Sequence, residues 1–199
     1  MSDEHSKIVA GEKLNQGKLF YSVDSITSEL VEVVSSFNDE EINQIPFEGS
    51  WTAAQVADHV RKSNNGIAQA LQMQGRSAER NAAERVTELK AVFLDFERKF
   101  KSPQFILPGQ TSYDKKELIE RLNRSIERIK QERANVDLSE IIDLTALGTI
   151  SKMELLHFVI YHTKRHIHQL KNIYKTIKTK THGTDQSVSQ FPGNNGGGI

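Results

Sequence analysis

Apolar residues recur at steps of three and four along most of this chain, and this helical period limits its fold more than any other feature. The period spans four long segments, residues 14–36, 52–74, 114–135 and 152–178. No segment alternates β-branched residues over the length of a strand. The sequence therefore predicts an all-α fold with four long helices.

Capping residues mark where three of these helices begin. Ser50 or Thr52 can cap the second helix, and Asp114 can open the third. Ser151, with Glu154 three residues later, has the spacing of a capping box at the start of the last helix. Each long segment after the first thus has a helix start as well as a helical period.

The connection between the second and third long helices, residues 75–113, is unusually long. Adjacent antiparallel helices are joined by about two to eight residues. This connection also carries a shorter periodic stretch, residues 86–100, that ends before Pro103 and includes Phe96 and Phe100. We therefore predict a four-helix bundle with a long crossover between helices 2 and 3.

The ends of the chain differ from its centre in composition. Residues 1–13 form a polar N-terminal segment, and residues 14–178 are expected to form the helical bundle domain. Residues 179–199 are rich in Gly, Asn, Ser and Gln, so they can bury too little apolar surface to offset the entropy of ordering. We expect this C-terminal tail to be disordered.

Charge and residue usage exclude several classes of protein. Basic and acidic residues both number 26, and no basic stripe with interleaved aromatic residues is present, so nucleic acid is not an expected partner. There is no long apolar run and no hydrophobic leader, so we expect no membrane association and a cytoplasmic location. Cysteine is absent, so a metal must be held by imidazole and oxygen, and a thiol reactant must come from another molecule.

Two histidines in the last helix point to a metal site. His162 and His166 are one turn apart, so both rings lie on one face, which they share with Gln169 and apolar residues. His157 and His168 fall on the opposite face and are not expected to be ligands. The position three before each histidine of the pair is Val159 or Thr163, so the Glu-x-x-His pattern of di-iron bundles is missing.

His59, in the second helix, is the third candidate ligand. Its helix face also carries Gln55, Ser63 and Gly66, which are candidates for the surroundings of an ion or for a substrate pocket. Small residues there can leave room near a metal or can serve close helix packing. Three histidines would leave coordination positions open, as catalytic metal sites do. The competing interpretation is a set of hydrogen-bonded core histidines without a metal.

Two segments resemble the signature regions of the DinB-like superfamily. The first is residues 48–60, where His59 follows Trp51 by eight residues, and the second is residues 155–170, where His162-x-x-x-His166 is followed by Gln169. The resemblance covers most of residues 14–178. It implies a four-helix bundle with a long crossover, a homodimer, and one divalent ion (zinc, nickel or iron) held by His59, His162 and His166.

The resemblance also implies a class of reaction. Members of the superfamily include thiol S-transferases that use low-molecular-weight thiols such as bacillithiol or mycothiol, which suggests a small-molecule substrate and a thiol cosubstrate. Activation of water for hydrolysis is the competing enzymatic interpretation, and the sequence offers no convincing general base for it. The alternative outside catalysis is a metal-binding or stress-related bundle that acts through dimer contacts.

Overall fold

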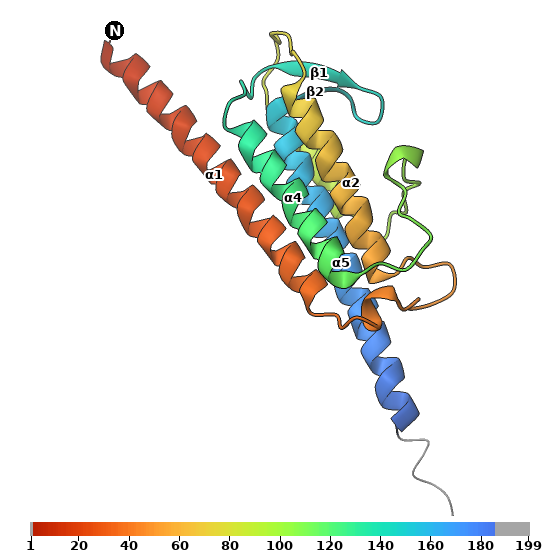
Figure 1. Cartoon of the computed structure of the whole chain (residues 1–199). Helices are drawn as coiled ribbons and strands as arrows, with labels where there is room; N and C mark the ends of the chain where they lie inside the picture. Colours follow the sequence, from red (N-terminus) through yellow and green to blue (C-terminus); the bar gives the residue numbers. More distant parts are fainter. Residues whose placement is uncertain (1, 186–199) are drawn as a thin grey trace, which may run out of the picture.

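The computed structural model describes the backbone of residues 2–185 and the side chains of residues 15–180. Four long helices form a bundle, α1 (Ser2–Ser35), α2 (Ala53–Gln72), α4 (Lys115–Arg133) and α5 (Lys152–Asp185) (Figure 1). The predicted four-helix bundle is confirmed. Within the described residues, no helix combines the length and the apolar character needed to cross a membrane.

The order of the helices explains the long crossover. α2 packs mainly against α4 and α5, and α1 packs against α5 and α4. In Figure 1, α2 and α4 run upward side by side, whereas α1 and α5 run downward. Parallel neighbours cannot be joined by a short turn, because the chain must travel back along the bundle. The segment between them does this, and it contains α3 (Val86–Leu94) and a 3-10 turn, η2 (Gln104–Ile106).

The predicted helix starts are present. Thr52 forms a capping box with Gln55 at the start of α2. The Asp114 carboxylate accepts a hydrogen bond from the Glu117 amide at the start of α4. Ser151 and Glu154 exchange hydrogen bonds, each backbone amide donating to the other side chain at 2.9 Å. A cap of this kind contributes about 1 kcal/mol to helix stability.

Both ends of the bundle extend beyond the expected bounds. α1 begins at Ser2, so residues 2–13 of the expected polar segment are part of the first helix. α5 runs past residue 178 to Asp185, since Ile177 is buried and the Lys180 ammonium donates to the Pro46 carbonyl. The remainder of the expected disordered tail, residues 186–199, lies outside the described residues.

The crossover helix is shorter than predicted. α3 ends at Leu94, because the Asp95 side chain accepts hydrogen bonds from the amides of Glu97 and Arg98 and closes a turn. Phe96 and Phe100 are consequently exposed rather than part of the core. The helical period persists in the sequence beyond the residue at which the helix stops.

A small hairpin is present where the sequence analysis predicts no strand. β1 (Ile141–Leu144) pairs antiparallel with β2 (Gly148–Ser151), and Ile142 lies opposite Ile150. Gly148 has a φ of 67°, a conformation that glycine adopts without a Cβ penalty. Strands of four residues are too short for an alternating pattern to be distinguished from a loop.

The core consists of two apolar clusters with a polar layer between them. Small buried polar residues come from every bundle helix, namely Thr27 from α1, Ser63 and Asn64 from α2, Ser125 from α4 and Thr163 from α5. Along α2 and α5, the layer falls between residues of one cluster and residues of the other. On α5 the interval between the clusters holds His162 and His166, whereas His59 on α2 lies beside Val60 of the first cluster.

Candidate metal centre

Three histidines from two helices converge inside the bundle. His59 is in the second turn of α2, and His162 and His166 are in the middle of α5, which packs against α2. Their exposed fractions are 3%, 6% and 7%. The Nε2 atom of His162 lies 3.2 Å from that of His59 and 3.1 Å from that of His166. The structure thus brings together all three residues that the sequence singles out as ligands.

The outer nitrogens of two rings determine where their protons lie. His59 Nδ1 is 3.0 Å from the Ile106 carbonyl oxygen, and His166 Nδ1 is 2.9 Å from the Gln169 amide oxygen. Both oxygens accept, so both Nδ1 atoms donate. In the neutral rings, the Nε2 atoms of His59 and His166 therefore carry lone pairs that face His162.

This arrangement leaves one of the three inner nitrogens without a hydrogen-bond donor. His162 Nε2 contacts two lone-pair nitrogens, and one N–H group can point to only one of them. A cation between the three Nε2 atoms would accept all three lone pairs. Two nitrogens at a usual Zn–N distance of ~2.05 Å, separated as observed here, subtend about 100° at the ion, near the tetrahedral angle. The residues present fit a divalent ion.

Burial keeps the three rings in the form that binds metals. It lowers the pKa of His59, lowers the pKa of His162 well below its usual value, and lowers the pKa of His166 to about 3. At neutral pH all three imidazoles are neutral, and the neutral form is the one that coordinates a metal.

Aromatic side chains surround the cluster. The Trp51 ring centroid is 5.2 Å from that of His59. Phe158 stacks on His162 at 5.0 Å, and Phe93 from α3 lies 6.1 Å from the same ring. The three histidines are buried next to these apolar rings, and a setting of low dielectric strengthens electrostatic interactions at the nitrogens.

The candidate pocket residues have different surroundings. Gln169 contacts a histidine directly, through the bond to His166. Gln55 is engaged in the cap of α2, and its amide nitrogen donates to the Gly109 carbonyl at 3.1 Å. Ser63 is buried one turn after His59, whereas Gly66 faces solvent. Of these four residues, Gln169 is the one whose side chain contacts a nitrogen of a candidate ligand.

Sequence reasoning missed the partner of His59. Ile106 acts through its backbone carbonyl, which is independent of side-chain identity, and it lies 47 residues from the ring that it contacts. Phe93, the wall residue from the crossover, appears in the sequence only as one member of a helical period. No motif marks either contact.

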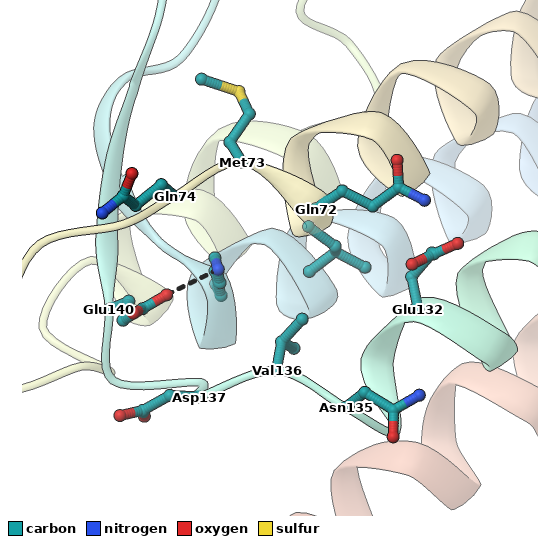
Figure 2. Close-up of a pocket in the computed structure, with 10 residues that line it drawn as sticks. Gln72, Met73, Gln74, Glu132, Asn135, Val136, Asp137 and Glu140 are labelled. Carbon is teal, nitrogen blue, oxygen red and sulfur yellow. Dashed lines mark hydrogen bonds and ion pairs between the residues drawn. The ribbon is translucent and has the colours of Figure 1, made fainter.

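A pocket of about 400 Å³ lies elsewhere, at the end of α2 near the hairpin. Its walls come from the ends of α2 and α4, the segment before β1 and the first residue of α5. Figure 2 shows Glu140 at this pocket, where its carboxylate pairs with the Lys152 ammonium at 2.6 Å. Leu71 in the wall is twelve residues beyond His59, about 18 Å along the helix. The pocket is therefore separate from the histidine cluster.

Comparisons with known protein sequences give matches over most of the chain. The family model of the DinB superfamily matches residues 23–170. The uncharacterized protein YuaE of Bacillus subtilis (strain 168) is 26% identical over 153 residues, which cover 73% of this chain and 90% of YuaE.

Two solved structures have a similar fold. TT2238, a four-helix bundle protein, has a TM-score of 0.52 at 16% identity, covering 79% of this chain and 98% of TT2238. YfiT from Bacillus subtilis, described as a probable metal-dependent hydrolase with an unusual four-helix bundle topology, has a TM-score of 0.53 at 14% identity, covering 82% and 87%. At these identities the likeness shows the fold alone.

Proposed function

Because this chain belongs to the DinB superfamily, we propose that it is a metal-dependent enzyme whose His59, His162 and His166 hold one divalent ion. The observation that carries the proposal is the convergence of three neutral imidazoles, two of which have their lone pairs fixed toward the third. Zinc, nickel and iron all accept imidazole ligands, so each is a candidate.

The ion would supply Lewis acidity. When bound by three neutral ligands it retains its full charge, and so it lowers the pKa of a thiol or water molecule at an open position. His59, His162 and His166 would hold the ion, and Trp51, Phe93 and Phe158 would form apolar walls beside it. Gln169 holds the His166 ring in place.

A low-molecular-weight thiol is the nucleophile that the residues favour. The described residues place three histidines, and no carboxylate, in the potential metal-binding group. Asp58, next to His59 in sequence, is occupied by Arg61, Lys62 and Tyr113. In the proposed reaction the thiol releases its proton to solvent, its sulfur bonds to an electrophilic carbon, and the leaving group departs with the bonding electrons. A stable leaving group needs no acid from the protein.

Hydrolysis is the second candidate, supported by the fold shared with YfiT and its description as a probable metal-dependent hydrolase. The same three histidines would serve, with water in place of the thiol. An amine or alkoxide leaving group would then need a proton, and the described residues place no carboxylic acid among the metal-binding groups. We therefore rank hydrolysis below thiol transfer.

A single set of assays separates these functions. Protein loaded in turn with Zn²⁺, Ni²⁺ or Fe²⁺ is incubated with cysteine-derived thiols and an aryl or alkyl halide, and separately with ester and amide substrates. Metal-dependent S-conjugates, detected by mass spectrometry and lost in His162→Ala, support thiol transfer, whereas ester or amide cleavage supports hydrolysis. A bound metal without either reaction would favour the non-catalytic alternative.

The proposal also includes a homodimer and a small-molecule substrate in the cytoplasm. Light scattering of the purified chain tests the dimer directly, since it measures a mass independent of molecular shape. A mass near twice that of the 22.5 kDa chain is expected. A mass equal to that of one chain would remove the dimer from the proposal.

A further inference from the structure

The crossover is tied to α2 beside the metal ligand His59. The Lys62 ammonium donates to the Leu107 carbonyl at 2.6 Å, and the Gln55 side chain donates to the Gly109 carbonyl at 3.1 Å. Both donors are on α2, one turn to either side of His59. The crossover segment between these two anchors starts right after Ile106, whose carbonyl accepts from His59.

A third tie closes the same loop from its other end. The Tyr113 hydroxyl accepts from the Gly109 amide at 2.6 Å and donates to the Asp58 carboxylate at 3.1 Å. That carboxylate also pairs with Lys62 at 3.2 Å. Lys62 is thus shared between an acid on its own helix and the crossover backbone.

From these contacts we propose that Lys62 is a positioning residue for the metal centre, which holds the Ile106 carbonyl against His59 by binding the next carbonyl along the chain. The proposal rests on the proposed metal site. Without the Lys62 bond, the peptide around Ile106 is free to turn away, and His59 Nδ1 loses its acceptor. The ring can then place its proton on Nε2, where it competes with a metal.

The positive charge of Lys62 should weaken metal binding, whereas its positioning of the Ile106 carbonyl should strengthen it. Burial lowers the pKa of His59, the hydrogen bond to Ile106 and the Asp58 charge raise it, and the Lys62 charge makes the smallest contribution, which lowers it. A cation bound there would be repelled by the same charge. Neutralising Lys62 should therefore tighten metal binding if charge alone matters, and should weaken it if positioning dominates.

The test compares Co²⁺ affinity, from the visible absorption of bound Co²⁺, in the full chain and three variants. Lys62→Met should weaken binding about tenfold, the low end of the effect of losing a partner of a ligating histidine. Lys62→Arg keeps a donor and the charge and should bind within about threefold of wild type. Lys116→Met, an exposed lysine on α4, is the matched control and should change nothing.

The outcomes separate the two proposals. If wild type binds no Co²⁺, the metal site itself is wrong. If wild type binds Co²⁺ and Lys62→Met binds it equally or more tightly, only the positioning role is overturned. Should Lys62→Met fail to fold, Lys62→Ala removes the same bond to the Leu107 carbonyl, and unchanged Co²⁺ affinity in that variant would overturn the role.

A measurement on metal-free protein supplies a readout independent of binding. Nitrogen-15 NMR of the histidine rings should show His59 protonated at Nδ1 in wild type, with Nε2 protonation appearing in Lys62→Met. Equal tautomer populations in the two proteins would contradict the proposal, because a general loss of stability does not change where a ring proton lies.

Discussion

The two sides of the candidate metal centre are built in different ways. On α5, both ligands and the partner of His166 lie within eight residues of a single helix, so helical geometry alone sets their relation. On α2, His59 is a single ligand, and its partner is the carbonyl of a residue in the crossover. One side is therefore preorganised by its helix, whereas the other depends on how a long connection packs.

Removing a metal ligand should have the largest effect on metal binding. The size of the effect should differ between a ligand on α5 and the ligand on α2. His162→Ala eliminates the nitrogen that contacts both others, so we expect no increase in melting temperature when Zn²⁺ or Ni²⁺ is added. His59→Ala leaves the α5 pair intact and should retain weak binding, detectable by calorimetry at high metal concentration. His168→Ala, an exposed histidine of the same helix, is the control and should behave as wild type.

Gln169 tests the preorganised side. Gln169→Leu removes the acceptor of His166 Nδ1–H, and loss of such a partner weakens metal binding about 10- to 100-fold. Gln169→Glu restores an acceptor and should recover most of the affinity in a Co²⁺ titration. If the Leu and Glu variants bind equally, the side chain has no role in holding His166.

The free energy of unfolding of the metal-free protein should depend on pH. His166 of α5 should contribute more to this dependence than His59 of α2. The folded-state pKa of His166 is lowered to about 3, so between the ordinary histidine pKa of 6.5 and that value the unfolded chain binds a proton that the folded chain does not. Stability is therefore lost as pH falls through this window, by up to about 1.4 kcal/mol per pH unit for this group. Urea unfolding with chelator at pH 7.0 and 5.5 measures the loss.

Replacing one histidine at a time shows which side contributes the pH dependence. His166→Asn should reduce the loss of stability between these two pH values more than His59→Asn does, because burial lowers the pKa of His166 further. An equal reduction in the two variants would mean that the folded-state pKa of His59, like that of His166, lies below the lower of these two pH values.

The smallest effect is expected at Thr163, which lies between the two ligands of α5. Its hydroxyl is fully buried and has no hydrogen-bond partner among the described residues. Thr163→Val keeps the shape and removes the unsatisfied group, so the free energy of unfolding should rise by about 1 kcal/mol. Metal affinity should stay unchanged, and a decrease would show that the hydroxyl serves the site.

The same contrast explains what the sequence could predict. The His162–His166 pair and Gln169 follow from helical spacing, and Ser151 with Glu154 is a local motif, so these features are readable from neighbouring residues. His59 was found through its helix face and the family resemblance. Local patterns were sufficient wherever one helix determines the arrangement.

Features that depend on tertiary packing were not predictable. The Ile106 carbonyl reaches His59 because the crossover folds back onto α2, and a backbone atom leaves no mark in the sequence. The helical period in residues 86–100 overestimated α3, because the Asp95 side chain ends the helix at a position that the apolar pattern does not show. The four-residue strands of the hairpin were below the length at which alternation is informative.

Metal content is the most direct test of the three-histidine site. Elemental analysis of protein purified without an affinity tag, for wild type and for His59→Ala, His162→Ala and His166→Ala, should find about one transition-metal ion per wild-type chain, as expected for a single three-ligand site. The ion should be lost or strongly depleted in each folded variant. Folded wild type that contains no metal, and takes up none on reconstitution, would contradict the account and leave a histidine cluster with a structural role.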